Sequence, residues 1–293
     1  MRLFLSLMIF CLPLSCLASQ TLKISDIQWR LKDSTLYISG EGDLPSNPDK
    51  YLIPWNGEKM SVAKLVITGN IKTIGSNFFE TYEYPALRSI DMSSSSVERI
   101  EKLAFCMFRH LKEVHFSDSL KIIEGHAFDH TGLRRVVLPP YAHCSGGVFH
   151  NCFALEYLSF PDSLRTTQMI SAQTSYIDTF EVQLSPVTDT IIPFTIGVLN
   201  VNHIEIPPSV RYIADSAFYY RYDERDRRQV MKKIYMRFSE QQILSMSWGP
   251  RWAEGLKKDV VIFVVPKGLK NIYEAFINRK YNYNFVIEES EWQ

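Results

Sequence analysis

The stretch Ala104–Ile123, AFCMFRHLKEVHFSDSLKII, decides the fold because its pattern of apolar residues returns along the chain. The next copy is Ala127–Pro139, AFDHTGLRRVVLP, and another is Val148–Pro161, VFHNCFALEYLSFP. Each copy has a small or branched apolar residue followed by Phe, as Ala-Phe or Val-Phe, and then the pattern Leu-x-x-apolar-x-apolar. A short period of this kind is typical of a solenoid, in which repeats stack and share one continuous interior.

The second apolar residue of each strand-like segment fixes the register of the repeat. The spacings between successive copies are 25, 24, 22, 22, 24, 22, 30 and 29 residues, so six of the eight lie within two residues of 23. In a strand, apolar–x–apolar spacing turns two side chains inward and the middle one outward. The register residues are Ile67, Met92, Phe116, Leu138, Phe160, Leu184, Ile206, Met236 and Val265.

Two stretches interrupt the regular pattern without breaking the register. Residues 165–180 are interpreted as a degenerate repeat, because Val182 and Leu184 stand midway between the strands at Leu158 and Ile204. The charged run Tyr219–Lys233 accounts for the 30-residue step and predicts an insertion on a loop. Its nearly even mixture of Arg with Asp and Glu favours a solvated loop, with an interaction loop as the alternative.

The first eighteen residues have the organisation of a secretory signal peptide. Arg2 precedes a largely apolar run from Leu3 to Leu14, and small residues lead to Ala18, after which cleavage is expected. The apolar run is too short to span a bilayer. Lipid attachment at Cys16 is the alternative to free release. Both routes predict a secreted, periplasmic or cell-surface protein.

Charge and cysteine content argue against a nucleic-acid-binding protein and against a disulfide-stabilised one. The chain has 32 Lys and Arg against 32 Asp and Glu, and loss of Arg2 with the signal peptide leaves 31 basic residues and a net charge of −1. A nucleic-acid partner needs a basic stripe, so none is expected. Three cysteines remain in the mature chain, Cys106, Cys144 and Cys152, and an odd number argues against a disulfide framework. No later stretch is long and apolar enough for a transmembrane helix.

Both ends of the mature chain carry patterns that would close a stack of repeats. A solenoid needs such caps because a terminal repeat otherwise exposes apolar surface and an unpaired strand. Residues 19–60 predict an N-terminal β-hairpin cap, since the segments around Trp29 and Tyr37 alternate on either side of a turn. The repeats then occupy residues 61–240. Residues 241–293 predict a last repeat and a cap with a helix-like pattern from Leu269 to Tyr281.

Over nearly its whole mature length the chain resembles the BspA-like leucine-rich repeat proteins, also called type 5 leucine-rich repeats. That family's unit is Ala-Phe-x-x-Cys followed by Leu-x-x-Val-x-Ile-Pro, which Val148–Pro161 nearly matches. Phe108 and Thr131 replace the cysteine in two other copies. Trp29–Gly42 looks like the family's N-terminal module, and Val265–Tyr273 looks like its C-terminal close.

The resemblance and the repeat together predict an α/β leucine-rich-repeat solenoid. Its parts would be a curved parallel β-sheet, turns or short helical pieces opposite, a small β cap in front and an α/β cap behind. The resemblance also implies an extracytoplasmic, often surface-exposed protein of host-associated bacteria, with adhesion or protein binding as the usual proposed role. The family shares no common set of binding residues.

One stretch carries ligand types that suit a metal or nucleophile site. His143-Cys144 and His150-x-Cys152 offer the nitrogen and sulfur ligands that zinc prefers. Cys152, however, stands at the repeat's buried position, where a free thiol behaves as a small hydrophobic group. The favoured interpretation is therefore a core thiol beside loop histidines, with a metal site as the alternative.

The second candidate, the histidine pair in His126–His130, lacks the Glu of a metalloprotease motif. No phosphate-binding loop, nucleophile elbow or paired acid and base can be read from the linear order. We therefore expect no enzymatic activity, no cofactor and no resident metal. The least favoured hypothesis remains a hydrolase or metal enzyme that uses His143, Cys144 and His150.

The outward strand positions are the better candidates for function. Side chains two apart on one strand share a face, and stacked strands lie about 4.8 Å apart, so these positions form a continuous concave strip. The strip is polar and includes tyrosines, which are favoured at recognition surfaces. The alternative is a face that is merely solvated. The candidate binding residues are Asp91, Glu113, His115, Arg135, Tyr157, Ser159, Gln183, His203, Glu205 and Tyr235.

The sequence thus predicts a non-enzymatic extracytoplasmic protein that binds a macromolecular partner at the cell surface. The expected partner is a protein or glycan, host-derived ligands included, and the oligomeric state is left open. The alternative is an envelope scaffold that binds its own kind through its ends or flank.

Overall fold

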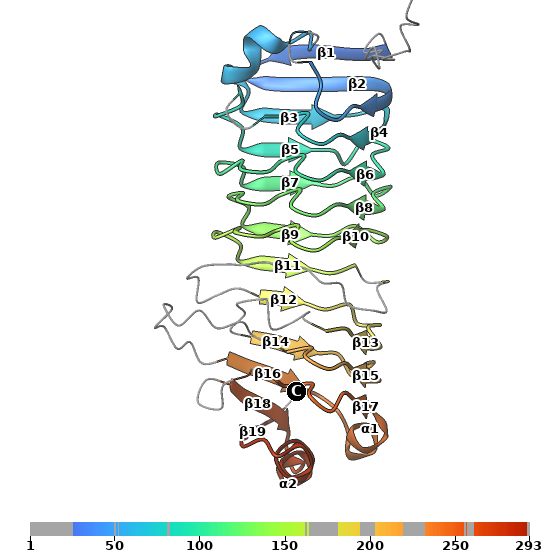
Figure 1. The fold of residues 1–293 in the computed structure, drawn as a ribbon, viewed down its shortest axis with the longest axis vertical. Helices are drawn as coiled ribbons and strands as arrows, with labels where there is room; N and C mark the ends of the chain where they lie inside the picture. The colour runs from blue at the N-terminus through green and yellow to red at the C-terminus, as the bar shows by residue number, and fades with distance from the viewer. Residues whose placement is uncertain are drawn as a thin grey trace, which may run out of the picture.

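The computed structural model describes residues 26–49, 51, 53–80, 83–161, 163, 181–193, 203–218, 232–254, 256 and 261–291. Within these ranges the chain winds into an elongated stack of coils, with longer strands on one side and very short strands on another (Figure 1). The predicted signal peptide with Cys16, the degenerate repeat at 165–180 and residues 219–231 of the charged insertion lie outside the described residues.

The first described element is an antiparallel hairpin. β1 (Ile27–Lys32) pairs with β2 (Thr35–Leu44) across a turn in which Asp33 and Ser34 have φ of 49° and 60°. Positive φ at both central residues is what a two-residue turn needs to match the twist of its strands. β2 then takes part in both sides of the stack, because its first half pairs with β3 (Lys64–Ile67) and its second half with β4 (Asn70–Ile74).

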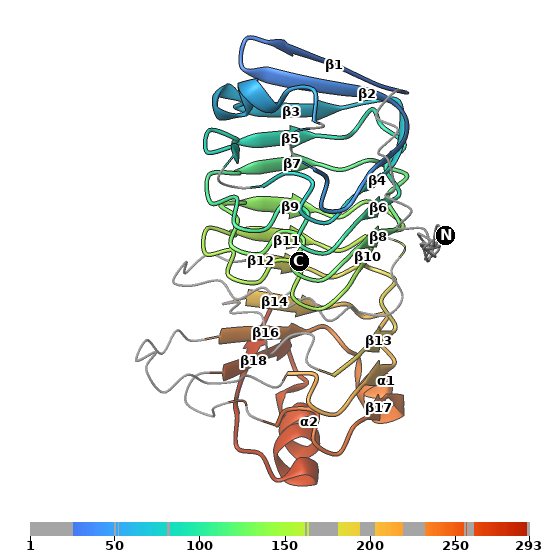
Figure 2. The same ribbon diagram turned by 45° about the horizontal axis from the view of Figure 1, so that its top comes forward.

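The longer strands run parallel along one side of the stack. In this column β2, β3, β5 and β7 belong to one sheet, and β9, β11, β12, β14, β16, β18 and β19 belong to another (Figure 2). A 3-10 helix at Asn56–Ser61 precedes the first of them. They are β3 (Lys64–Ile67), β5 (Ser89–Asp91), β7 (Glu113–His115), β9 (Arg135–Val137), β11 (Tyr157–Ser159), β12 (Glu181–Gln183), β14 (His203–Ile206), β16 (Lys232–Met236), β18 (Val261–Pro266) and β19 (Val286–Ser290).

The register predicted from the repeat is confirmed. Leu158 pairs with Val136 on one side and Val182 on the other, so equivalent apolar residues of successive coils meet. Every residue of the predicted register, from Ile67 to Val265, is buried. Stacked apolar positions of this kind are what a solenoid uses in place of a globular core.

A second column of short strands faces the first, where the sequence predicted turns or short helical pieces. That prediction was wrong for these segments, because Ile100, Ile123 and Cys144 each sit inward in a parallel two-residue strand. Two residues are too few to show the alternation that reveals a strand. The column contains β4 (Asn70–Ile74), β6 (Arg99–Ile100), β8 (Ile122–Ile123), β10 (His143–Cys144), β13 (Thr190–Ile191), β15 (Tyr212–Ile213) and β17 (Ser247–Trp248).

Between the two columns runs a row of stacked phenylalanines. The ring centroids of Phe79 and Phe105 are 5.5 Å apart, those of Phe105 and Phe128 5.3 Å, and those of Phe128 and Phe149 5.8 Å. The rings are tilted by only 14° to 24° to one another. Each of these rings is the second residue of the equivalent pair in its repeat, which is Phe-Phe, Ala-Phe, Ala-Phe or Val-Phe, so one repeat position supplies the whole row.

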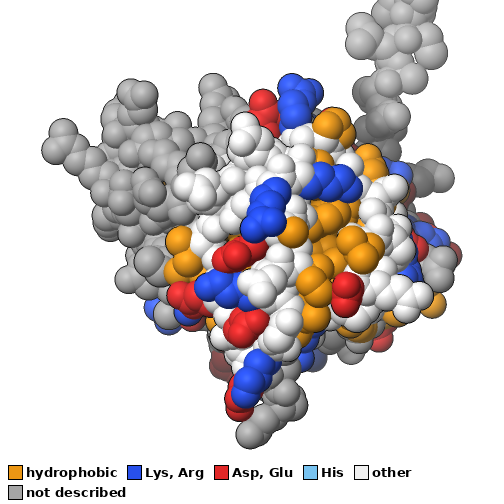
Figure 3. Space-filling model, turned by 90° about the horizontal axis from the view of Figure 1, so that it is seen from below, with side chains coloured by type: hydrophobic (Ala, Val, Ile, Leu, Met, Phe, Trp, Pro, Cys, Tyr) orange, Lys and Arg blue, Asp and Glu red, His pale blue; other side chains and the backbone are white. Residues whose placement is uncertain are grey.

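The α-helices of the described part of the chain lie at its C-terminal end. α1 (Glu240–Ser245) starts with a capping box formed by Ser239 and Gln242. α2 (Lys270–Tyr273) continues as a π-helical segment, Glu274–Lys280, ahead of β19. Hydrophobic side chains lie among charged ones on this end of the molecule (Figure 3). Within the described part of the chain, no helix has the length and apolar character needed to cross a bilayer.

Candidate functional site

The outward side chains of the longer strands β5, β7, β9, β11, β12, β14 and β16 form a surface that we call the strand face. All the candidate binding residues occupy outward strand positions here and are exposed or half-buried. β7 shows the pattern most simply, with Glu113 and His115 exposed on either side of buried Val114. The structure therefore places these residues on one surface, while their role in binding stays a prediction.

In the middle of the strand face Tyr157 is held by both neighbours. The guanidinium carbon of Arg135 lies 3.7 Å from the centroid of the tyrosine ring. The Tyr157 hydroxyl donates a hydrogen bond to Oε1 of Gln183. Since cation–π contact and hydrogen bond fix the ring before any partner arrives, binding there would lose less side-chain entropy.

A second ordered group lies further along the strand face. The rings of His203 and Tyr235 stack with centroids 4.2 Å apart and an interplanar angle of 27°. Arg237 contacts Glu205 twice, with Nε 2.8 Å from Oε1 and Nη2 donating to Oε2 at 3.1 Å. Arg237 follows β16 and was not among the predicted residues. Its only sequence signal is its position directly after the register residue Met236.

At the other end of the strand face Asp91 is stabilised in its charged form. Burial tends to raise the pKa of this carboxyl, but two hydrogen bonds from Ser93 and the nearby charges of His115 and Lys64 outweigh it and hold the pKa below its usual value. Asp91 and His115 pair across β5 and β7. The strand face thus presents a fixed negative charge here.

The structure does not bring His143, Cys144 and His150 together as a nucleophile site. His143 and Cys144 are consecutive on β10, where His143 is exposed and Cys144 is buried. Burial raises the pKa of the Cys144 thiol to about 12 and that of Cys152 to about 11. Reactive cysteines need the thiolate, so both thiols are unsuited to nucleophilic attack. Cys152 is a core residue, as the repeat predicted, and its thiol contacts Thr131 and the carbonyl oxygen of Phe128.

Cysteine alkylation should report this burial directly. In the native protein we expect iodoacetamide to label Cys106, which is half-buried, and to leave Cys144 and Cys152 unmodified until denaturant is added. Peptide mass spectrometry measures the label at each position. Equal labelling of Cys144 without denaturant would contradict the inward placement of β10.

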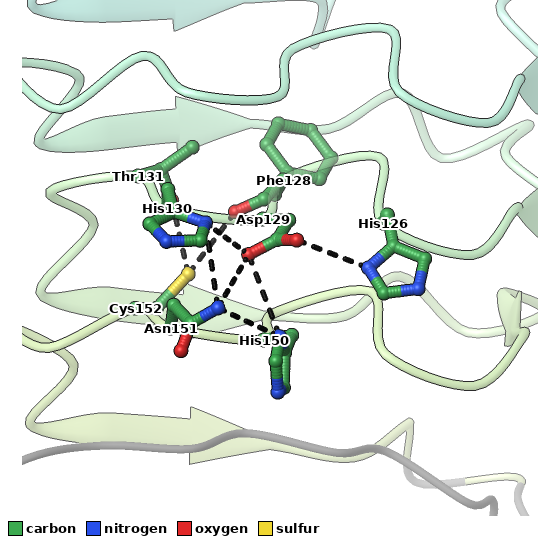
Figure 4. A network of polar contacts seen from close by, with 8 residues as sticks. All are labelled: His126, Phe128, Asp129, His130, Thr131, His150, Asn151 and Cys152. Atoms are coloured by element: carbon green, nitrogen blue, oxygen red, sulfur yellow. Dashed lines mark hydrogen bonds and ion pairs between the residues drawn. The ribbon is translucent and has the colours of Figure 1, made fainter.

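A histidine cluster on the turns beside the short strands was not predicted to come together. His126, Asp129 and His150 each offer one ligand atom, and these atoms all lie within 4.8 Å of one another (Figure 4). His126 and His150 come from successive coils. When successive repeats are aligned, Asp129 and His150 occupy the same repeat position. This relation is visible only from that alignment and not from the spacing of residues within one motif.

A model of the BspA type leucine rich repeat region matches the chain in six copies, over residues 58–145 and 119–224. No curated protein matches the sequence. Among solved structures, a leucine-rich repeat protein from T. pallidum is 17% identical, with 90% of this chain and 98% of that chain covered and a TM-score of 0.39.

Two further solved structures are similarly distant. A leucine-rich repeat protein from Eubacterium ventriosum is 16% identical, with 73% of this chain and 77% of that chain covered and a TM-score of 0.35. One from Bacteroides ovatus is 15% identical, with 90% of this chain and 75% of that chain covered and the same TM-score of 0.35.

Proposed function

The chain belongs to the BspA-type leucine-rich repeat family, and on that premise we propose that it is a non-enzymatic extracytoplasmic protein that binds a macromolecular partner through the strand face. Repeats of this family are typically found in bacterial surface proteins. The partner in this proposal is a protein or glycan at the cell surface, host-derived ligands included. The signal peptide expected at residues 1–18 supplies the route of export, with Cys16 as the alternative point of attachment.

The observation that carries this proposal is the prior ordering of aromatic side chains on the strand face. Tyr157 is fixed by Arg135 and Gln183, and Tyr235 by the ring of His203. Tyrosine joins a large apolar area to a polar tip, and ordered tyrosines often dominate binding energy.

Substituting Tyr157, Glu205 and Tyr235 together by Ala should abolish partner binding. The mature chain would first capture its partner from host matrix and bacterial surface extracts, and the captured molecule would then be titrated against the variant. Loss of one central tyrosine costs about 2 kcal/mol in a typical interface, or roughly 30-fold in Kd, so three changes should leave no measurable affinity.

The matched control is the triple Ala variant of Tyr141, Tyr212 and Glu240, which are exposed and lie off the strand face. It should bind like the unchanged protein. Both variants should melt close to the parent temperature, because substitutions of exposed side chains outside the core are usually nearly neutral. Full binding by the first variant would rule out the strand face as the contact surface.

Self-association as an envelope scaffold is the second candidate. β19 is the terminal strand of its sheet, and hydrophobic side chains lie on the same end of the molecule (Figure 3). Terminal strands invite pairing with another chain. In our leading proposal, by contrast, the hairpin within 19–60 and residues 241–293 close the repeats at 61–240. Light scattering that finds one chain per particle at every concentration would exclude the scaffold.

A further inference from the structure

The histidine cluster lies on two turns that the backbone holds in fixed register. His126 and His130 flank one turn with φ of 60° and 56°, and Gly147 and Asn151 occupy the equivalent places one coil later, with φ of 77° and 53°. The N–H of His130 donates to the carbonyl oxygen of His150 at 2.9 Å. The buried aromatic residues between these positions anchor both turns to the core, so the polar side chains stand outside it.

At the centre of the cluster one carboxylate faces three imidazoles. Oδ2 of Asp129 is 3.0 Å from Nδ1 of His126, and Oδ1 is 2.7 Å from Nδ1 of His130 and 3.7 Å from Nδ1 of His150 (Figure 4). The Asp129 side chain is only 13% exposed, whereas those of His126 and His150 are 43% and 34% exposed. The carboxylate is therefore largely withdrawn from bulk water while the imidazoles remain reachable.

These separations suit a single bound ion. Zinc–ligand bonds of about 2.0–2.1 Å in a tetrahedron place ligand atoms roughly 3.4 Å apart. The 3.0 Å between Oδ2 of Asp129 and Nδ1 of His126 lies just below that value, and the 3.7 Å between Oδ1 of Asp129 and Nδ1 of His150 lies just above it. Two imidazoles with one carboxylate favour a divalent transition metal over Mg²⁺ or Ca²⁺, which prefer oxygen ligands.

The side chain of Asn151 contacts two of the three groups that would bind the ion. Its amide nitrogen lies 2.7 Å from Nδ1 of His150, 3.2 Å from Oδ1 of Asp129 and 3.4 Å from Nδ1 of His130. The amide N–H₂ group can donate to His150 and Asp129, and so occupies lone pairs that a metal ion would need. Rotation of this one side chain would free those lone pairs for a metal.

The ring of His126 packs against Gly147 of the next coil. A Cβ atom at Gly147 would lie 3.0 Å from Cε1 of His126 and 3.3 Å from its Nε2. The imidazole therefore rests against the bare backbone of the next coil, where a side chain would crowd the ring and shift it by a few tenths of an ångström. A glycine at this repeat position, where the coils before it carry Leu103 and His126, keeps the ring within reach of the carboxylate.

We propose that His126, Asp129 and His150 bind a divalent transition-metal ion such as Zn²⁺ across two successive coils. His130 acts as a positioning residue, because its contact with Asp129 orients the carboxylate from outside the ligand set. Solvent completes the coordination, as in three-ligand zinc sites. Because the ligands come from neighbouring coils, the ion clamps one turn onto the next.

The experiment is calorimetric titration of the untagged, chelator-treated mature protein with ZnCl₂. We expect one ion per chain and a higher melting temperature in its presence, since a ligand that binds only the folded state stabilises it. Magnesium at the same concentration should neither bind nor raise the melting temperature. An unsaturable heat signal, or a melting temperature indifferent to zinc, would overturn the proposal.

Substitutions within and outside the cluster test which side chains bind the ion. His150→Gln and Asp129→Asn should each weaken zinc binding at least about 10-fold, as loss of a ligand or its support does. The control, His143→Gln, removes an exposed histidine on β10 outside the cluster and should bind zinc normally. Asn151→Asp replaces the blocking amide with a carboxylate and should bind more tightly. Unchanged affinity in His150→Gln, or weaker binding in Asn151→Asp, would contradict the site, and the gain of affinity tests it even if a loss variant fails to fold.

Discussion

Phe128→Ala should lower the free energy of unfolding by about 3–5 kcal/mol, the range for removing a large aromatic side chain from a packed interior. The Phe128 ring is fully buried between Phe105 and Phe149, and the edge of Phe116 meets it with centroids 5.7 Å apart. Backbone bonds between coils fix the spacing of the stack, so the neighbouring rings cannot close the gap. Urea titration followed by circular dichroism measures the change.

The same substitution at Phe153 provides the control, since that ring is 46% exposed and lies one coil further along. Phe153→Ala should change stability by less than about 1 kcal/mol. Phe149→Ala should behave like Phe128→Ala, because it holds the equivalent repeat position. Equal, small effects at positions 128 and 153 would mean that the phenylalanine row does not support the stack.

The sequence predicted the fold well because the stack repeats one set of physical requirements. Each strand must hide two apolar side chains, so residues such as Leu138 and Phe160 recur at nearly constant spacing and reveal the register. The short strands around Ile123 gave no such signal. Their pairing depends on where the preceding turn delivers two residues, which is a property of the stack and not of the local sequence.

Of the two polar sites, one could be predicted from the sequence and the other could not. The strand face could be predicted because outward positions follow from alternation, although the contacts of Tyr157 with its neighbours could not. The cluster around Asp129 was missed because its members are one repeat apart and sit on turns with positive φ, where alternation does not say which way a side chain points.

A buried lysine near the N-terminal end was equally invisible in the sequence. Lys59 lies in the 3-10 helix at Asn56–Ser61, and its side chain is 3% exposed. Its ammonium group forms an ion pair with Glu83, whose side chain is 13% exposed, and lies 5.8 Å from the centroid of the Tyr84 ring. Lysine is almost never buried without a partner, so this pair is expected to matter for stability.

Glu83→Gln should therefore destabilise the protein by about 3 kcal/mol, because it leaves the Lys59 ammonium buried without its counter-charge. The decisive control is the pair of the same type between Lys267 and Glu291, whose side chains are 70% and 75% exposed. There Glu291→Gln should cost no more than about 0.5 kcal/mol, since water screens an exposed pair. Replacing both buried partners, with Lys59→Met and Glu83→Leu, should recover most of the loss, because the penalty comes from an unpaired buried charge and not from the missing attraction. If chemical denaturation finds equal costs for Glu83→Gln and Glu291→Gln, burial is not what gives the first pair its importance.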